Sequence, residues 1–220
     1  MNPVVANGLV LSVFPGIDLL GRAFEETGYT VVRGPDLLWG GNIYDFHPPA
    51  GVFEGVIGGP PCQGESNLAA LNGRRGETMA DEFARVVDEA RPRWWVMEAV
   101  IPHAAPYILP LNNRWLGEKQ NRKRYFHSNL DLARHIEVSL FEHPEWKHAV
   151  LAAHHGESEG SVYRGMATYS WEERCELQGV PEDFLADAPF TVTGKKLLLG
   201  SGVPMAMGRA VAKAVRRATA

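Results

Sequence analysis

Apolar and polar positions alternate along the first half of the chain in a way that predicts strands separated by helices. Four short, largely apolar runs have the length and composition of buried strands: residues 9–14, 29–33, 52–57 and 94–97. Helices are expected at residues 19–27, after the N-cap residue Asp18, and at residues 78–91. Strands that alternate with helices indicate a parallel sheet covered by helices, which is an α/β fold.

The pattern changes after residue 125. Residues 125–167 hold a cluster of histidines, of which His143 and His148 have a permissible metal-ligand spacing. No cysteine pair accompanies them, so we favour a segment that faces solvent or nucleic acid over a metal site. A helix is expected to begin near Ser170, and another covers about residues 203–218.

Composition narrows the class of protein. A chain of 220 residues can bury one good core or one domain with a small appendage. The two cysteines, Cys62 and Cys175, indicate no disulfide framework, so a reduced cytoplasmic compartment is expected, and Cys175 is expected in the core with most of the tryptophans. No apolar run approaches the roughly 20 residues that span a bilayer, and no signal-peptide pattern opens the chain. The net charge of −4 neither suggests nor excludes nucleic acid.

The most informative segment is residues 58–63, with the sequence Gly-Gly-Pro-Pro-Cys-Gln. It follows an apolar strand, and its glycines and prolines end that strand in a rigid turn. Cys62 therefore stands at the carboxyl end of a strand, where open α/β sheets bind ligands. A thiolate is more available near neutral pH than an ionised hydroxyl, so this position suits a nucleophile.

Residues 58–63, together with Ser66, resemble the catalytic loop of the cytosine-C5 DNA methyltransferases. Other motifs of that family follow in the usual order: residues 11–20 resemble the cofactor-binding first motif, 98–100 the Glu-Asn-Val motif, 120–124 the Gln-x-Arg-x-Arg motif, 173–184 the ninth motif and 200–204 the tenth. The resemblance implies a Rossmann-like S-adenosylmethionine-dependent methyltransferase sheet with a small recognition insert. It also implies methylation of cytosine C5 in DNA.

The resemblance assigns catalysis to Cys62, Glu98 and Arg122. The Cys62 thiolate would add to C6 of cytosine and make C5 nucleophilic. Glu98 would hold N3 and the exocyclic amine as charge develops on the ring. Arg122 would contact the cytosine carbonyl or a phosphate, while Arg124 is expected to be structural or to face a phosphate. Ala99 replaces the family asparagine, which predicts altered loop support rather than loss of activity.

Residues implied for the cofactor S-adenosylmethionine are Phe14, Gly16, Ile17, Asp18, Asp36, Asn42, Pro60, Ser201 and Val203. Asp36 is expected at the ribose hydroxyls and Asn42 at the adenine amino group. Asp18 replaces a family glycine, and it either caps the helix or faces the cofactor. Ser201 replaces a family asparagine, which leaves a modified cofactor open.

Residues implied for nucleic-acid binding are Gln63, Ser66, Arg74, Arg75, Gln120 and Arg124. We expect a catalytic domain at residues 1–124 plus 168–220 and a small target recognition segment at residues 125–167. The target base must leave the helix to be methylated. So short a segment predicts a short target sequence, or a partner that supplies recognition surface. We otherwise expect a monomer without a membrane partner.

Three alternatives stay open. A weakly active or inactive homologue could bind nucleic acid for regulation, which the small recognition segment and the Ala99 and Ser201 departures favour. One branch of the resembled family methylates tRNA, so RNA is a second possible substrate. Transfer of a group larger than methyl is the third.

Overall fold

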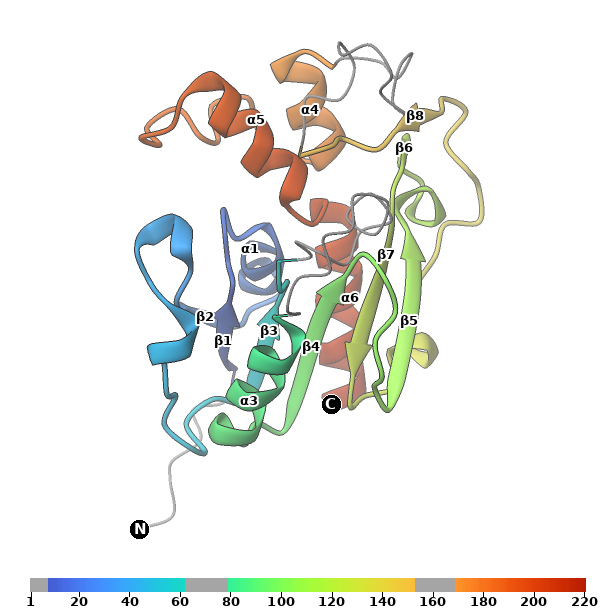
Figure 1. Cartoon of the computed structure of the whole chain (residues 1–220). Coiled ribbons are helices and arrows are strands. Elements are labelled where there is room, and N and C mark those ends of the chain that lie inside the picture. Colours follow the sequence, from blue (N-terminus) through green and yellow to red (C-terminus); the bar gives the residue numbers. More distant parts are fainter. Residues whose placement is uncertain (1–7, 62–78, 153–168) are drawn as a thin grey trace, which may run out of the picture.

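A mostly parallel sheet forms the centre of the molecule (Figure 1). The computed structural model describes residues 8–61, 79–152 and 169–220. Within them the main sheet has six strands in the order β2-β1-β3-β4-β7-β5. The strands are β1 (Leu9–Val13), β2 (Thr30–Arg33), β3 (Gly55–Gly58), β4 (Trp94–Ala99), β5 (Tyr107–Asn112) and β7 (Lys123–Ser128). The first four run parallel, and β7 is antiparallel to both β4 and β5.

Helices cover both faces of this sheet. α1 (Leu19–Glu26) and α6 (Met205–Thr219) pack on one face, and α3 (Ala80–Ala90) lies on the other (Figure 1). Alternate strand residues divide between the two cores, with Val10, Ile57 and Val96 on the α1–α6 side and Leu11, Val56 and Met97 on the α3 side. Because both faces are buried, the parallel strands read as nearly continuous apolar runs. The predicted α/β fold is confirmed.

A smaller lobe stands beyond the carboxyl ends of the parallel strands, at the top of Figure 1. It contains the short pair β6 (Gln120–Asn121) and β8 (Lys147–His148), and the helices α4 (Trp171–Gln178) and α5 (Val192–Ser201). Ser170 and Glu173 form a capping box at the start of α4. Four short 3-10 helices complete the described elements: η1 (Leu37–Trp39), η2 (Ile43–Asp45), η3 (Asn113–Leu116) and η4 (Leu132–Arg134).

The predicted elements match the observed ones to within a few residues, but the domain boundary at residue 125 is wrong. Residues 125–128 belong to β7, between β4 and β5 in the main sheet, and Leu132 is buried in the same core. The pattern hides β7 because its buried residues include the polar His127 and Ser128. β5, β7 and α5 were not among the predicted elements. The recognition role predicted for residues 125–167 stays a prediction.

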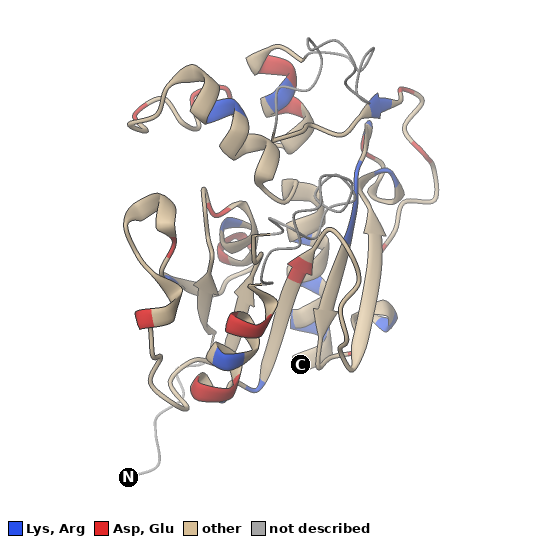
Figure 2. Ribbon diagram, viewed as in Figure 1, with Lys and Arg blue, Asp and Glu red and all other residues tan. Residues whose placement is uncertain are grey.

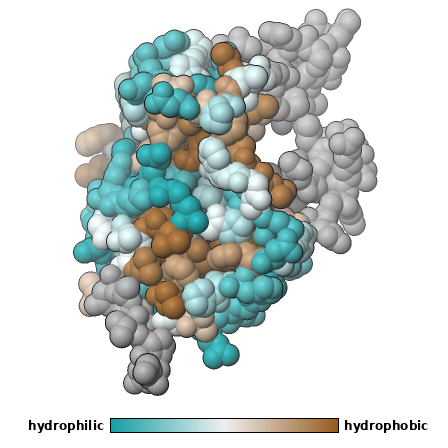
Figure 3. Space-filling model, turned by 90° about the vertical axis from the view of Figure 1, so that its left-hand side faces the viewer, coloured by the Kyte–Doolittle hydropathy of each residue, from teal (hydrophilic) through white to brown (hydrophobic). Residues whose placement is uncertain are grey.

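Burial agrees with the sequence for some side chains and not for others. Trp94 and Cys175 are buried in the core, as expected. Trp39 and Trp115 are instead 56% and 43% exposed, which corrects their expected core position. Figure 3 shows apolar surface on the face that carries β2. Val32 of β2 and Leu37 of η1 are among the exposed large apolar residues. Within the parts of the chain that the structure describes, no helix is long and apolar enough to cross a membrane.

Candidate active site

The turn between β1 and α1 directs backbone amides to the carboxyl edge of the sheet. Phe14, Gly16 and Asp18 all have positive φ, so the chain reverses sharply after β1. The Gly16 amide donates to Asp36 Oδ2 at 2.8 Å, and the Leu38 amide donates to Asp36 Oδ1 at 2.8 Å. Asp36 thereby joins the segments that follow β1 and β2, at the edge where open α/β sheets bind ligands.

Two neighbouring clefts open at this edge and share Phe14, Asp36 and Pro61 as wall residues. The outer cleft, of about 530 Å³, is lined mostly by apolar groups: Phe14, Pro35, Asp36, Leu37, Gly41, Asn42, Ile43, Tyr44, Pro61 and Met79. The central cleft, of about 450 Å³, lies between the sheet and the small lobe, and its walls include Gly59, Glu98, Arg122, Arg124, Leu151, Leu198 and Gly200. Both volumes fall in the range of small-molecule sites.

Glu98 and Arg124 form an ion pair in the central cleft. Glu98 lies on β4, and its Oε1 is 2.7 Å from Arg124 Nε on the adjacent strand β7. Figure 2 shows the acidic end of β4 beside the basic start of β7. Gly59 leaves room for the carboxylate, because a Cβ there would lie 3.1 Å from Glu98 Oε2. Burial raises the pKa of Glu98 above its ordinary value, although Arg124 and Arg122 act to lower it.

Arg122 is turned into the protein, although it also lines the central cleft. It is 2% exposed and donates to the carbonyls of Val150 at 2.5 Å, Gly200 at 2.8 Å and Gly202 at 3.2 Å. These contacts give its guanidinium a structural role, which the sequence had instead assigned to Arg124. The arginine beside Glu98 is Arg124.

Gln120 is wrongly predicted to bind nucleic acid. It is fully buried, its Nε2 donates to the Leu177 carbonyl at 2.6 Å, and its Oε1 accepts from the Val150 amide at 3.1 Å. Its amide therefore fastens β6 to α4 and to the segment after β8. The motif spacing alone does not separate such a buried amide from one that faces a ligand.

Most of the residues predicted to hold the cofactor line the clefts. Phe14, Gly16, Ile17, Asp36, Pro60 and Ser201 line the central cleft, and Asn42 lines the outer one. The Asn42 side chain caps η2, accepting from the Tyr44 amide at 3.2 Å and donating to Asp45.

Asp18 and Val203 stand apart from those two clefts. Both are buried and border a cavity of about 60 Å³ below the central cleft. Asp18 accepts from the Gly21 amide and from the Ser12 hydroxyl, and it pairs with Arg33 at 2.8 Å. Of its two expected roles, the helix cap is the one observed.

Part of the predicted site lies outside the described residues, namely Cys62, Gln63, Ser66, Arg74 and Arg75. The described chain reaches Pro61, which lines both clefts. Cys62 is the next residue in the sequence after Pro61, a wall residue of the central cleft.

Trp39 is a further site residue that the sequence reading missed. Its Nε1 donates to the Gly16 carbonyl at 2.8 Å, and its ring lies 5.4 Å from that of Phe190, just before α5. It thus links the β1–α1 turn to the small lobe at the edge of the central cleft. Nothing in the sequence around residue 39 distinguishes it from a core tryptophan.

His127 supports the loop that follows Glu98. It is fully buried opposite Met97, its Nε2 accepts from the His103 amide at 2.9 Å, and its Nδ1 lies 3.2 Å from the Met97 carbonyl. An acceptor role for Nε2 requires the proton on Nδ1, so the neutral ring fits both contacts. This buried imidazole supplies loop support beside Ala99, where the resembled family has asparagine.

No family profile matches the chain. Over 148 residues it is 26% identical to the type II methyltransferase M.NgoPII of Neisseria gonorrhoeae, a match that covers 57% of the chain and 41% of that protein. Over 118 residues it is 26% identical to the type II methyltransferase M.DdeI of Desulfomicrobium norvegicum. This match covers 42% of the chain and 28% of that protein.

This chain is therefore similar in sequence to two type II methyltransferases. The family resemblance carried by its motifs is thereby confirmed. The matched part of this chain spans less than half the length of either relative. A mutant of Spodoptera frugiperda DNMT2 superposes with a TM-score of 0.65 at 11% identity, covering 96% of this chain and 100% of that one, so the fold is a methyltransferase fold.

Arg122→Met should lower the free energy of unfolding of this protein by about 3 kcal/mol, because three buried or partly buried carbonyls lose a charged donor. Urea unfolding of the wild type and the variant measures the effect. Lys123→Met, at the exposed neighbouring position, is the matched control and should change stability little. An equal, small effect of both substitutions would contradict the structural role of Arg122.

The stability of this protein should depend on pH through His127. Burial lowers the pKa of His127 below its ordinary value, so the unfolded chain takes up this proton at a higher pH than the folded one. The contribution of His127 is therefore complete above about pH 6.5 and is lost as pH falls through the folded-state pKa. His127→Gln should flatten the fall in urea midpoint between about pH 7 and pH 5, whereas the control variant His135→Gln, at a half-buried position, should not. Parallel pH profiles for all three proteins would rule out this role.

Proposed function

We propose that this protein transfers a methyl group from S-adenosylmethionine to C5 of cytosine in DNA, with Cys62 as the covalent nucleophile. The observation that carries the proposal is the Glu98–Arg124 ion pair in the central cleft. Pro61 lines the same cleft, and Cys62 is the next residue in the sequence. An acid and a cation thus face each other in this cleft, and a second, largely apolar cleft lies beside it. DNA as the substrate is supported by the two type II methyltransferase relatives.

The clefts fit the two halves of S-adenosylmethionine. The outer cleft offers apolar walls for a purine, with the carboxylate of Asp36 at its boundary with the central cleft. The Gly16 turn and Ser201 border the central cleft, where the methionine half would lie. The cofactor supplies an electrophilic methyl group on a sulfonium sulfur, and this group would have to face the central cleft.

The proposed chemistry takes place on the cytosine ring. The Cys62 thiolate adds to C6, the C5 carbon so activated takes the methyl group, and loss of the C5 proton then expels the thiolate. Glu98 would hold N3 and the exocyclic amine. Because burial raises its pKa, Glu98 takes up a proton more readily than an exposed glutamate does, and it would share that proton with N3 as charge develops.

Arg124 takes the role at the base that the sequence had given to Arg122. Arg124 pairs with Glu98, whereas the guanidinium of Arg122 is occupied by backbone carbonyls. Arg124 would contact the cytosine carbonyl and also hold Glu98 in place.

Cys62→Ser should abolish turnover while S-adenosylmethionine binding and the unfolding midpoint stay unchanged, because a serine hydroxyl is far less ionised near neutral pH. Wild-type protein should form a covalent adduct on DNA that carries fluorine at cytosine C5, and the serine variant should not. Cys175→Ala, which changes the buried cysteine of the small lobe, is the control and should keep activity. Equal adduct formation by the serine variant would refute a Cys62 nucleophile.

The same assay separates the alternatives. Methylation should be detected at base resolution on DNA and compared with tRNA, with the product mass measured in each case. A tRNA-only product would shift the proposal to RNA, and a heavier product would indicate a larger transferred group. Nucleic-acid binding without any transfer would point to a regulatory homologue.

Glu98→Gln should slow single-turnover methylation by about a hundredfold or more, because the amide cannot provide the charge and proton of the acid in the transition state. DNA affinity should change far less, and fluorescence anisotropy measures it in the same preparations. The control is Glu137→Gln, a surface glutamate paired with Arg217. Matching losses in rate and affinity would instead assign Glu98 a purely structural role.

A further inference from the structure

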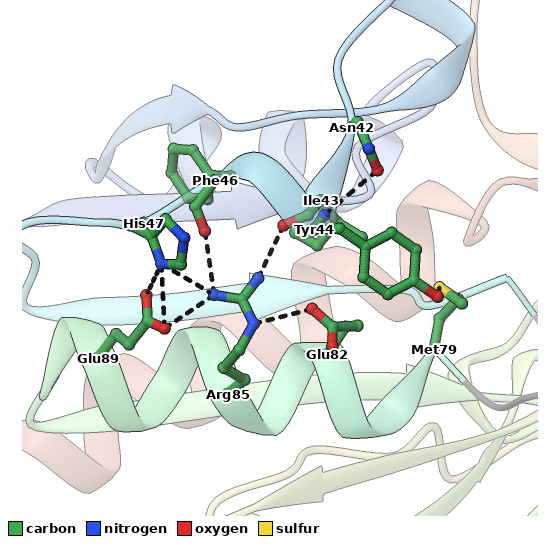
Figure 4. A network of polar contacts seen from close by, with 9 residues as sticks. All are labelled: Asn42, Ile43, Tyr44, Phe46, His47, Met79, Glu82, Arg85 and Glu89. Atoms are coloured by element: carbon green, nitrogen blue, oxygen red, sulfur yellow. Dashed lines mark hydrogen bonds and ion pairs between the residues drawn. The ribbon is translucent and has the colours of Figure 1, made fainter.

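Arg85 gathers four acceptors around one guanidinium on the face of α3. Its Nη2 donates to the Ile43 carbonyl at 2.7 Å and its Nη1 to the Phe46 carbonyl at 3.1 Å. Its Nε pairs with Glu82 at 2.8 Å, and Nη1 pairs with Glu89 at 2.9 Å. Figure 4 shows the guanidinium between α3 and the η2 segment, with contacts from both.

The two carboxylates fix the direction of this guanidinium. Glu82 and Glu89 lie three residues before and four residues after Arg85, so both reach it from the same side of the helix. His47 adds a contact to Glu89 at 3.0 Å. A planar fork with five donors can serve all these acceptors, whereas the single ammonium of lysine cannot.

The carbonyls that Arg85 holds belong to a wall of the outer cleft. η2 is a single helical turn, and within it Ile43 is buried while Tyr44 and Asp45 are exposed. Asn42, Ile43 and Tyr44 all line the outer cleft. Because only one of the three η2 residues is buried, we expect the Arg85 hydrogen bonds to set the distance between η2 and the sheet.

The far side of the same cleft is tied to α3 as well. Tyr44 Oη lies 3.8 Å from the Met79 sulfur, and Met79 precedes the first residue of α3 and lines the cleft. The aromatic ring and the thioether thus meet across the opening. Contacts from α3 and its N-cap therefore reach both the wall and the rim of the outer cleft. Arg85 itself does not line the cleft.

We propose that Arg85 is a positioning residue for the nucleoside half of the cofactor. It holds the η2 backbone at the separation from the sheet that admits a purine. The inference rests on the proposed function, since S-adenosylmethionine is the nucleoside-containing ligand. Preorganising a wall lowers the cost of ordering it at the moment of binding, so the effect should appear in affinity.

The test compares two ligands that share the nucleoside, S-adenosylhomocysteine and methylthioadenosine, by titration calorimetry. Methylthioadenosine lacks the amino-acid half. Arg85→Lys and Arg85→Met should weaken both ligands by a similar factor, about tenfold, which corresponds to about 1.4 kcal/mol. Glu82→Gln should give a smaller loss of the same kind. Arg134→Met is the control, because Arg134 is 80% exposed and pairs with Asp131 far from the outer cleft.

Kinetics adds a readout that a general loss of structure would not reproduce. In the Arg85 variants the KM for S-adenosylmethionine should rise while kcat stays near the wild-type value. Arg85→Lys keeps the charge and covers the case in which Arg85→Met fails to fold. Wild-type affinity in both variants, or weakening of S-adenosylhomocysteine alone, would overturn the inference. Wild-type protein that binds neither ligand would instead overturn the proposed function, and the inference with it.

Discussion

The hydrogen bonds of one buried guanidinium, that of Arg122, connect the main sheet to the small lobe, and the rest of this structure depends on them. Arg122 is 2% exposed, and its two terminal guanidinium nitrogens donate to the carbonyls of Val150, Gly200 and Gly202. Desolvating a cation costs several kcal/mol unless such partners stand in fixed positions. Gln120 and Gln178 add buried amide contacts beside it. The small lobe is thereby held at one distance from the sheet, and that distance sets the width of the central cleft.

The two clefts at the carboxyl edge of the sheet differ in the polarity of their walls. Near β4 and β7 the walls carry an acid and a cation in a partly dry setting, where electrostatic effects are stronger than in water. Near β2 and α3 the walls are mostly apolar, and Arg85 of α3 holds one of them through its contact with the Ile43 carbonyl. A ligand with an apolar ring at one end and charge at the other suits this gradient. The parallel strands generate it, because their carboxyl ends bring separate loops to one edge.

The fold and much of the site could be predicted from the sequence, because their signals are local. Apolar runs mark β1, β3 and β4, and Gly16 and Pro60 stand where the strands end. Side-chain direction in less regular segments could not be predicted in this way. Arg122 and Arg124 are two residues apart, yet one guanidinium binds backbone carbonyls and the other pairs with Glu98.

Long-range contacts account for the other differences. Arg85 looks like an ordinary helix-surface arginine between two glutamates, since its partners Ile43 and Phe46 lie some forty residues earlier in the sequence. β7 escaped detection because two of its three buried residues are polar and find partners only in the folded sheet. Such residues become recognisable only when the strands that face them are known.

The position of Trp39 has an optical consequence. Its indole is half exposed, is hydrogen-bonded to the turn after β1 and lies against an aromatic ring of the small lobe. Indole emission shifts with the polarity and water content of its surroundings. Any closing or opening of the central cleft would change both for this ring, whereas Trp94 stays enclosed in the core. The protein therefore carries a built-in fluorophore at the junction of its two lobes, and the light it emits would follow their relative movement without any attached dye.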